Sequence, residues 1–586
     1  MTYRVNRAFC GAVLALVAAV FVSCAHQRVT WTPETVKPPE SLEAAMELVA
    51  GAPTQPTQPA PAPPAPETPA AEGALQITRD GAILTALSNN RSLAVARYGP
   101  AVGETLEPEA RAVFDPRFLA TTSLGRDTSP ISGISRYTIG RALSSGGGLS
   151  VSDLVVPDDP DETFINVMET LTELFSAKKY DPFIEAWQSS GTASVRNVLP
   201  TGTEVFLTGG VTRALSNFTP EEYTGEWSVG VNQALLRGAG PAVNLVALRQ
   251  ARNNAARTEH VFRNDLLQLV QQVETAYWDL VLARELLKIR EFSVQLAEQQ
   301  QARTQDLVDV GRAIQGAVIA ALAEAESRRA DLADARALVK TRTIALIRLL
   351  NPDAADEWRV EFDPVDTPAV EQVDIDGDIS DKLALLYRPE LAQARLELAN
   401  RELDVVRTQN GLLPRLDAFV SYGRQSLGES LGSSTYYLDN NDYDNFAVGV
   451  SLEVPLLNRA ERARYRRARF IEAQAEASVD NLEQLLEAEV RAAVVEVRRQ
   501  WERVTSTRAA VAAREEQLRI QQDRFSVGMS TDLDVLLVQR DLIQAQVDEV
   551  TARVQYIQAL TNLYKAEGTL LARRGVVPEE QWGTDD

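Results

Sequence analysis

The sequence predicts a mainly α-helical protein with a smaller β part, in which one unit of strands and a long helical hairpin occurs twice. Two observations carry this prediction. Identical residues recur at a constant spacing over more than a hundred positions, and two stretches of about 65 residues lack proline and place apolar residues at heptad spacing. The chain is therefore expected to form two equivalent supersecondary units rather than several unrelated domains.

The duplication has two shifts. A shift of 217 superposes the later part of the copies, as in Val273 and Val490, Val310-Gly311 and Val527-Gly528, and Ala335-Arg336 and Ala552-Arg553. Upstream the shift is 298, as in Pro116-Arg117 and Pro414-Arg415, and Gly125-Arg126 and Gly423-Arg424. The difference, 298 − 217 = 81, indicates an insertion in the first copy at about residues 127–227. Leu199-Pro200-Thr201-Gly202-Thr203 lies between alternating runs there, so we expect an extra hairpin or an ornate loop.

Each copy is expected to contain a helix, two strands, a long helix, a tight turn and a returning helix. In the first copy these are a helix at 79–98, strands Phe118–Ser123 and Trp227–Val231, and helices at about 243–308 and 316–350. In the second they are a helix at 379–410, strands Leu416–Tyr422 and Phe446–Val450, and helices at about 460–525 and 533–567. Four strands per chain follow from this pattern.

The N-terminal part is expected to be processed and tethered. Residues 1–23 have the basic start and short apolar run of a signal peptide, and Phe21-Val22-Ser23-Cys24 resembles a bacterial lipobox that makes Cys24 the lipidation site. A proline-rich tether at 24–74 follows. The remaining boundaries are a first repeat at 75–350, a linker at 351–374, a second repeat at 375–570 and a tail at 571–586.

Composition argues against several classes of function. The net charge of −22 disfavours a nucleic-acid binder, because binding phosphates needs concentrated basic patches. His26 and His260 are the two histidines of the chain, and no metal-ligating cluster, phosphate-binding loop or nucleophile motif is recognisable. We therefore expect no catalytic residue, no metal and no cofactor, and we expect that the protein is not an enzyme.

The expected elements are incomplete in a single chain. Four strands cannot close a barrel, and an open edge in lipid leaves backbone groups without hydrogen bonds. Helices of roughly 100 Å, at 1.5 Å per residue, also exceed the roughly 30 Å of bilayer hydrocarbon, so most of their length is expected in water. A homo-oligomer supplies partners for strands and helices alike. The alternative is a lipid-anchored, non-channel periplasmic coiled-coil scaffold or adaptor.

The duplication, the passage Gln233-Ala234-Leu235-Leu236-Arg237-Gly238 and the segment Ser526–Leu536 resemble the TolC-like outer-membrane efflux proteins. The resemblance covers about residues 75–570. It implies a homotrimer with a twelve-stranded barrel in outer-membrane lipid and a periplasmic tunnel of twelve helices, a trimeric α/β-barrel channel. It further implies a lipoprotein that acts as the exit duct of a tripartite efflux pump or of type I secretion. The implied partners are a periplasmic adaptor and an inner-membrane RND or ABC transporter.

The same resemblance assigns roles to residues at the two chain reversals. Val310, Gly311, Val527 and Gly528 are expected at adaptor-docking tips, although glycine there also simply permits a turn. Asp532 and Asp534 have two interpretations. Asp532 caps the returning helix while Asp534 complements its dipole, or Asp534 forms a ring of three carboxylates at the periplasmic aperture.

Two positions depart from the family pattern. Ala317 stands where relatives commonly carry an aspartate, and Ser530 stands where some carry an arginine. The family's closing salt bridge therefore does not carry over, and the sequence names neither the closing mechanism nor the transported substrate.

Overall fold

The computed structural model describes residues 75–130, 183–217, 219–310, 314–351, 362–440, 443–527 and 529–576. They fall within one compact unit, Gly73–Asp586. The expected signal peptide, Cys24 and the tether lie outside the described residues, as do Gly311, Gly528 and much of the insertion.

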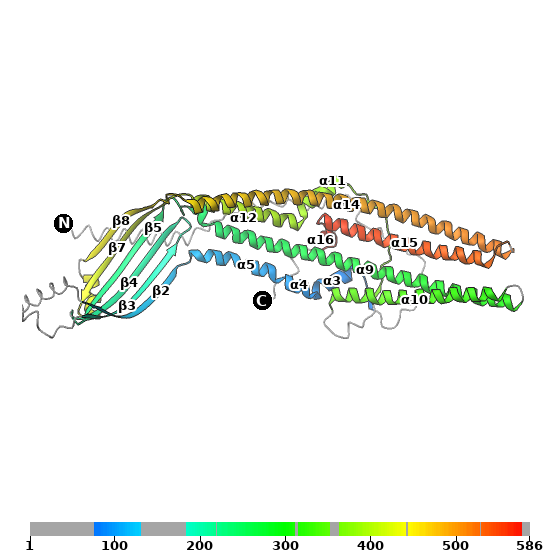
Figure 1. Ribbon diagram of the computed structural model, residues 1–586, viewed down its shortest axis with the longest axis horizontal. Coiled ribbons are helices and arrows are strands. Elements are labelled where there is room, and N and C mark those ends of the chain that lie inside the picture. The colour runs from blue at the N-terminus through cyan, green and yellow to red at the C-terminus, as the bar shows by residue number, and fades with distance from the viewer. Residues whose placement is uncertain are drawn as a thin grey trace, which may run out of the picture. The chain divides into compact units, whose positions relative to one another are not determined.

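Two very long helical hairpins dominate this unit, as the duplication predicts (Figure 1). The first consists of α9 (Val246–Asp309) and α10 (Gln315–Leu350), and the second of α14 (Arg459–Ser526) and α15 (Asp532–Ala566). The predicted seam residues Val273, Tyr277, Val490 and Val497 are all buried. Heptad spacing forms these rods because it keeps one apolar stripe facing a neighbour over many turns.

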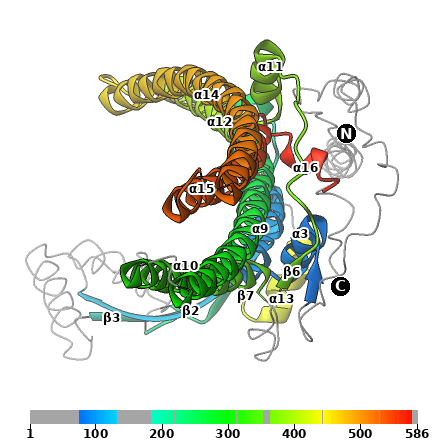
Figure 2. The same ribbon diagram turned by 90° about the vertical axis from the view of Figure 1, so that its right-hand side faces the viewer.

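The hairpins lie side by side. Helix α9 packs against both α10 and α15, and α15 packs against α14. Seen along the helices, α14, α15, α9 and α10 follow an arc rather than a closed ring (Figure 2). The arc leaves α10 at one end and α14 at the other, so each has a side without a helical neighbour among these four.

Shorter helices precede the strands in both copies. The single helix expected at 79–98 is wrong: the first copy has α3 (Arg79–Asn89), α4 (Arg91–Ala96), α5 (Tyr98–Arg111) and the 3₁₀ turn η1 (Ala112–Phe114). The break after α3 falls at Asn90, whose side chain accepts from Leu93 N at 3.1 Å and caps α4.

The second copy corrects one expectation. The single helix expected at 379–410 is two helices, α11 (Gly377–Tyr387) and α12 (Pro389–Gly411). Arg388 between them is extended, because a residue that precedes proline is disfavoured in the helical region. Pro389 then serves as the first residue of α12.

One six-stranded antiparallel sheet lies at one end of the helices (Figure 1). Its strands are β2 (Arg117–Pro130), β3 (Phe183–Val198), β4 (Thr203–Ser216), β5 (Glu222–Ala234), β7 (Arg415–Gly428) and β8 (Asp444–Glu453), paired in that order. The expectation of four strands is therefore wrong. All four are present, and the insertion adds the hairpin β3–β4 between them, with its turn at the segment identified from the sequence.

Smaller elements complete the described fold. The two-stranded parallel sheet of β1 (Leu75–Ile77) and β6 (Phe362–Pro364) had no sequence signal. Three short helices are α8 (Pro241–Asn244), α13 (Leu431–Asn440) and α16 (Leu570–Arg573).

Buried tyrosines hold the extended segment that links the copies. The Tyr277 hydroxyl donates to Asp366 Oδ2 at 2.7 Å, and the Tyr556 hydroxyl donates to Glu371 O at 3.1 Å. Burial and the bond to Asp366 raise the pKa of Tyr277 well above its usual range, so this hydroxyl stays protonated. Arg284 of the first hairpin also donates to Asp363 and Arg498 of the second donates to Ile375 O, so both hairpins keep residues 362–376 against the helices.

Candidate functional site

Side-chain hydrogen bonds fix the turn at the tip of the second hairpin. Thr531 is the N-cap of α15, and its hydroxyl accepts from Asp534 N at 3.3 Å. Asp534 Oδ2 accepts in return from Thr531 N at 3.0 Å and from Thr531 Oγ1 at 2.6 Å. This is a capping box, so the expectation that Asp532 caps the helix is wrong: Asp532 is already the first helical residue.

The Asp534 carboxylate is partly exposed, and its Oδ2 accepts hydrogen bonds from donors of its own turn. Hydrogen bonds from Thr531, with a weaker one from Ser530, lower the pKa of Asp534 below its usual value, because they stabilise the ionised form. Gln521 of α14 also donates to Ser530 Oγ at 2.5 Å. The turn therefore presents a fixed negative charge.

The first hairpin lacks this device. By the shift of 217, Ile314 stands at the place of Thr531 and Ala317 at the place of Asp534, and α10 begins without a side-chain cap. An exposed valine precedes each turn, since Val310 and Val527 are 68% and 69% exposed. Gly311, Gly528 and the Asp532 side chain lie outside the described residues.

The sheet has two chemically different faces. Residues paired across antiparallel strands share a face, so the register assigns every side chain. The first, called the apolar face, carries Phe118, Leu124, Trp187, Val195, Val205, Leu207, Val229, Val231, Val420, Tyr422, Phe446, Val448, Val450 and Leu452. The second, called the polar face, carries Thr121, Ser123, Thr192, Ser194, Thr208, Thr212, Ser228, Asn232, Ser421, Gln425, Asn445 and Ser451, together with the apolar residues Leu119, Phe206, Phe419 and Leu427.

The apolar face carries charged residues at the end of the sheet that lies away from the helices. Arg126, Arg213 and Arg424 lie there, and α13 packs over the ends of β5 and β7. Arg424 donates to Asp439 O at 3.0 Å, and the Ser426 and Ser434 hydroxyls are 3.0 Å apart. An apolar band bordered by charged and aromatic residues is typical of a surface that meets lipid.

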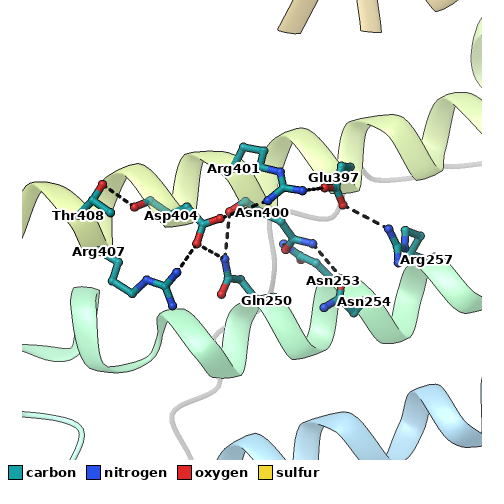
Figure 3. Close-up of polar contacts among 10 residues, drawn as sticks. All are labelled: Gln250, Asn253, Asn254, Arg257, Glu397, Asn400, Arg401, Asp404, Arg407 and Thr408. Carbon is teal, nitrogen blue, oxygen red and sulfur yellow. Dashed lines mark hydrogen bonds and ion pairs between the residues drawn. The ribbon is translucent and has the colours of Figure 1, made fainter. Parts of the chain in front are cut away.

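A polar interface between α12 and α9 joins the two copies (Figure 3), at the end of the helices that adjoins the sheet (Figure 1). Asn400 of α12 is buried and contacts α9 twice, donating to Asn254 Oδ1 and accepting from Asn253 Nδ2, both at 3.0 Å. Gln250 Nε2 donates to Asp404 Oδ1 at 2.9 Å. Hydrogen bonds with such geometry specify one alignment of α9 and α12, which apolar contacts alone do not. Gln250, Asn253 and Asn254 recur at the three- and four-residue spacing of one helix face, but the prediction of the helices followed apolar residues alone and so missed this interface.

Within the described ranges, neither a membrane-spanning helix nor a metal-binding cluster is found. No helix there is both long and apolar enough to cross a bilayer. No group of three or more histidine, cysteine, aspartate or glutamate residues there is placed to hold a metal ion. His260 lies within α9, where burial and nearby Arg263 lower its pKa.

Comparison with known proteins gives a consistent relationship. Residues 382–569 match the family described as "Outer membrane efflux protein", which confirms the resemblance found in the sequence. BepC, an outer membrane efflux protein of Brucella suis, is 25% identical over 381 residues, covering 62% of this chain and 76% of BepC. PrtF, a proteases secretion protein of Dickeya chrysanthemi, is 29% identical over 197 residues, which span 32% of this chain and 40% of PrtF.

Solved structures share the fold over most of the chain. The outer-membrane channel OprN is 17% identical, with a TM-score of 0.59 over 87% of this chain and 99% of OprN. The open state of the Neisseria gonorrhoeae MtrE outer membrane channel is 16% identical, with a TM-score of 0.54 over 87% of this chain and 98% of MtrE. At such identities the likeness establishes the fold.

Proposed function

We propose that this chain, which is related to the TolC-like outer-membrane efflux proteins and has their fold, forms a passive exit duct in the outer membrane. The observation that carries this proposal is the two-faced sheet with two open edges, joined to an arc of long helices. An apolar face suits lipid, and a polar face suits a water-filled lumen. Transport through such a duct needs no catalytic residue in this chain.

The sheet edges favour a closed assembly of identical chains. Among the described strands, β2 and β8 each have one neighbour, so each presents a row of unpaired backbone groups. They run in opposite directions, and β8 of one chain would therefore pair with β2 of the next in the antiparallel manner of the whole sheet. The family resemblance makes the number of chains three, and the helical arcs of three chains would enclose the tunnel.

The tips are the proposed docking points for a periplasmic adaptor. Val310 and Val527 offer exposed apolar contacts at the ends of the hairpins farthest from the sheet, with Gly311 and Gly528 next to them in sequence. The adaptor would connect the duct to an inner-membrane RND or ABC transporter, which supplies the energy and much of the substrate choice. Lipid attached to Cys24 would anchor the chain to the outer membrane.

Asp534 is proposed to line the periplasmic aperture. Three copies of an ionised, partly exposed carboxylate would form a ring that favours cations. Replacing Asp534→Asn keeps the side-chain volume and removes the charge, so we expect reduced cation preference in planar bilayers. The matched variant Ala317→Asp adds a charge at the corresponding place of the first tip and should increase cation preference. Unchanged selectivity in both variants would contradict the ring.

Reconstitution tests the duct itself. Purified chain in lipid bilayers is expected to form trimers that give discrete conductance steps. A lipid-anchored coiled-coil scaffold, the alternative function, would give neither. Gene neighbours encoding a proton-driven or an ATP-driven transporter would then distinguish small-molecule efflux from type I secretion.

A further inference from the structure

The inserted hairpin is part of the sheet, where it separates the two strands of the first copy. Strand β3 pairs with β2 from Arg117 to Pro130, and β4 pairs with β5 from Thr203 to Ala214, both without interruption. In the second copy, by contrast, the two strands β7 and β8 pair directly. Where the second copy has one strand pairing, β7 with β8, the first copy has three: β2 with β3, β3 with β4, and β4 with β5.

The two added strands have the same alternation as their neighbours. On β4, Val205, Leu207 and Val211 lie on the apolar face, while Glu204, Thr208 and Thr212 lie on the polar face. On β3, Val195, Ala193 and Trp187 lie on the apolar face, with Gly191 and Ser189 between the last two, and Ser194, Thr192 and Gln188 lie on the polar face. A hairpin that lay in water outside the sheet would not need to continue the apolar face across both of its strands.

In each copy, one aromatic ring packs over a glycine of the neighbouring strand, and in the first copy this ring comes from the inserted hairpin. In the second copy the ring of Phe419 on β7 covers Gly449 on β8, with its Cζ 2.6 Å from where a glycine side chain would begin. Gly230 in Val229-Gly230-Val231 of β5 matches Gly449 in Val448-Gly449-Val450 of β8, and the ring of Phe206 on inserted β4 covers it in the same way, with its Cζ at 2.4 Å. By the shift of 298, the counterpart of Phe419 in the first copy is Thr121 on β2, which carries no ring.

The turn of the hairpin is also fastened to the junction between sheet and helices. Asn244 Nδ2 donates to Pro200 O at 3.1 Å, and Gly240 N donates to Thr201 O at 3.0 Å. Gly202 itself has φ +82° and approaches the backbone so closely that a side chain there would begin 2.3 Å from Gly238 O. Such fixed backbone contacts hold the hairpin in register with the original strands.

From these observations we infer that the β3–β4 hairpin is a permanent part of the membrane wall, so that three chains close eighteen strands, six from each, instead of the twelve implied by the family resemblance. This inference rests on the proposed trimeric duct. With about 4.8 Å between strands and a tilt of about 40°, the wall diameter becomes roughly 36 Å rather than roughly 24 Å. The outer mouth would therefore admit solutes of larger hydrated cross-section than a twelve-stranded wall does.

The wall position of the hairpin can be tested with paired cysteine labels on the full chain. Leu207 shares its cross-strand row with Phe446, and Thr208 shares its row with Asn445, through the pairings of β4, β5, β7 and β8. In reconstituted trimers, a fluorophore on Leu207→Cys should be quenched by lipid-borne quencher as strongly as one on Phe446→Cys. A fluorophore on Thr208→Cys should be quenched by aqueous quencher, like one on Asn445→Cys. Aqueous quenching at both positions 207 and 208 would overturn the inference.

Deletion and direct imaging test the width. A structure of the trimer determined by electron microscopy should show eighteen strands around the wall. Deleting residues 131–216 removes both inserted strands, and adding Thr121→Phe restores a ring over Gly230 when β2 pairs with β5. In this repaired variant the largest polyethylene glycol that enters from the outer side should be smaller by at least about one third in diameter, because the same side-chain layer lines a narrower wall. An unchanged size limit, or twelve strands in the conducting full-length trimer, overturns the eighteen-strand wall alone; failure of the full chain to form trimers overturns the proposed duct as well.

Discussion

At the scale of single residues, the capping of α15 shows why residue type alone did not identify the cap. Asp532 and Thr531 both have side chains that cap helices well. The N-cap must have an extended backbone, and Thr531 has φ −92° and ψ 158°, whereas Asp532 is already helical. The capping pattern Thr-x-x-Asp was present in the sequence, and it was the signal that went unused.

Removal of this cap should loosen the second tip selectively. Thr531→Ala loses the hydroxyl that accepts from Asp534 N, and an N-cap threonine contributes about 1 kcal/mol to the local helix. We expect faster amide hydrogen exchange over residues 532–535. Ile314→Ala is the matched control at the first tip, where α10 has no side-chain cap, and its exchange should stay unchanged. Equal acceleration at both tips would argue against the capping role.

A second residue-scale prediction concerns a buried ion pair. Glu274 of α9 is fully buried and receives two hydrogen bonds from Arg574, at 2.6 and 3.1 Å. Arg574→Met would leave the carboxylate buried and unpaired, which costs about 3–5 kcal/mol. We expect a clearly lower Tm in detergent. The double variant Glu274→Met with Arg574→Met should recover much of the loss, and a double variant as unstable as the single one would show that packing, rather than unpaired charge, is responsible.

At the scale of elements, local sequence patterns predicted the helices well and the β part less completely. The heptad stripes of α9 and α14 are long and regular, so their existence and approximate ends follow from spacing alone. The strands β3 and β4 also alternate, but alternation does not reveal which neighbour a strand pairs with. Their position between β2 and β5 depends on contacts far apart in the sequence.

The turn of the inserted hairpin gives a prediction with an internal control. Gly202 and Gly238 both have φ +82°, but an added side chain would meet Gly238 O at 2.3 Å in the first case and nothing closer than 3.9 Å in the second. Gly202→Ala should therefore reduce the yield of folded protein much more than Gly238→Ala, which adds only the backbone strain. Similar yields, measured as heat-stable oligomer on gels, would contradict the close fit of this turn.

At the scale of the whole molecule, the open edges of the sheet predict contact between chains. In the proposed trimer β8 of one chain pairs with β2 of the next. A cysteine at Ala120 combined in turn with cysteines at Phe446, Val448 and Val450, all on the apolar face, should give disulfide-linked dimers and trimers for at least one combination. Moving the β2 cysteine to Ala193, which lies inside the sheet, should abolish these products. Absence of cross-links from every combination would contradict the edge pairing.

The amino-acid sequence alone determined the duplication, the long helical hairpins and the four strands common to both copies. Periodicity and repetition are local properties, and they persist whatever the chain packs against. The resemblance to outer-membrane efflux proteins followed from the same segments.

The tertiary structure decided what depends on residues distant in sequence. It placed the inserted hairpin inside the sheet, covered Gly230 with Phe206, and joined α9 to α12 through Asn400. It also chose Thr531 as the cap and divided the sheet into an apolar and a polar face. Strand pairing, the packing of a ring over a glycine and buried amide hydrogen bonds stabilise the fold only when both partners are in place. No single stretch of sequence therefore predicts them.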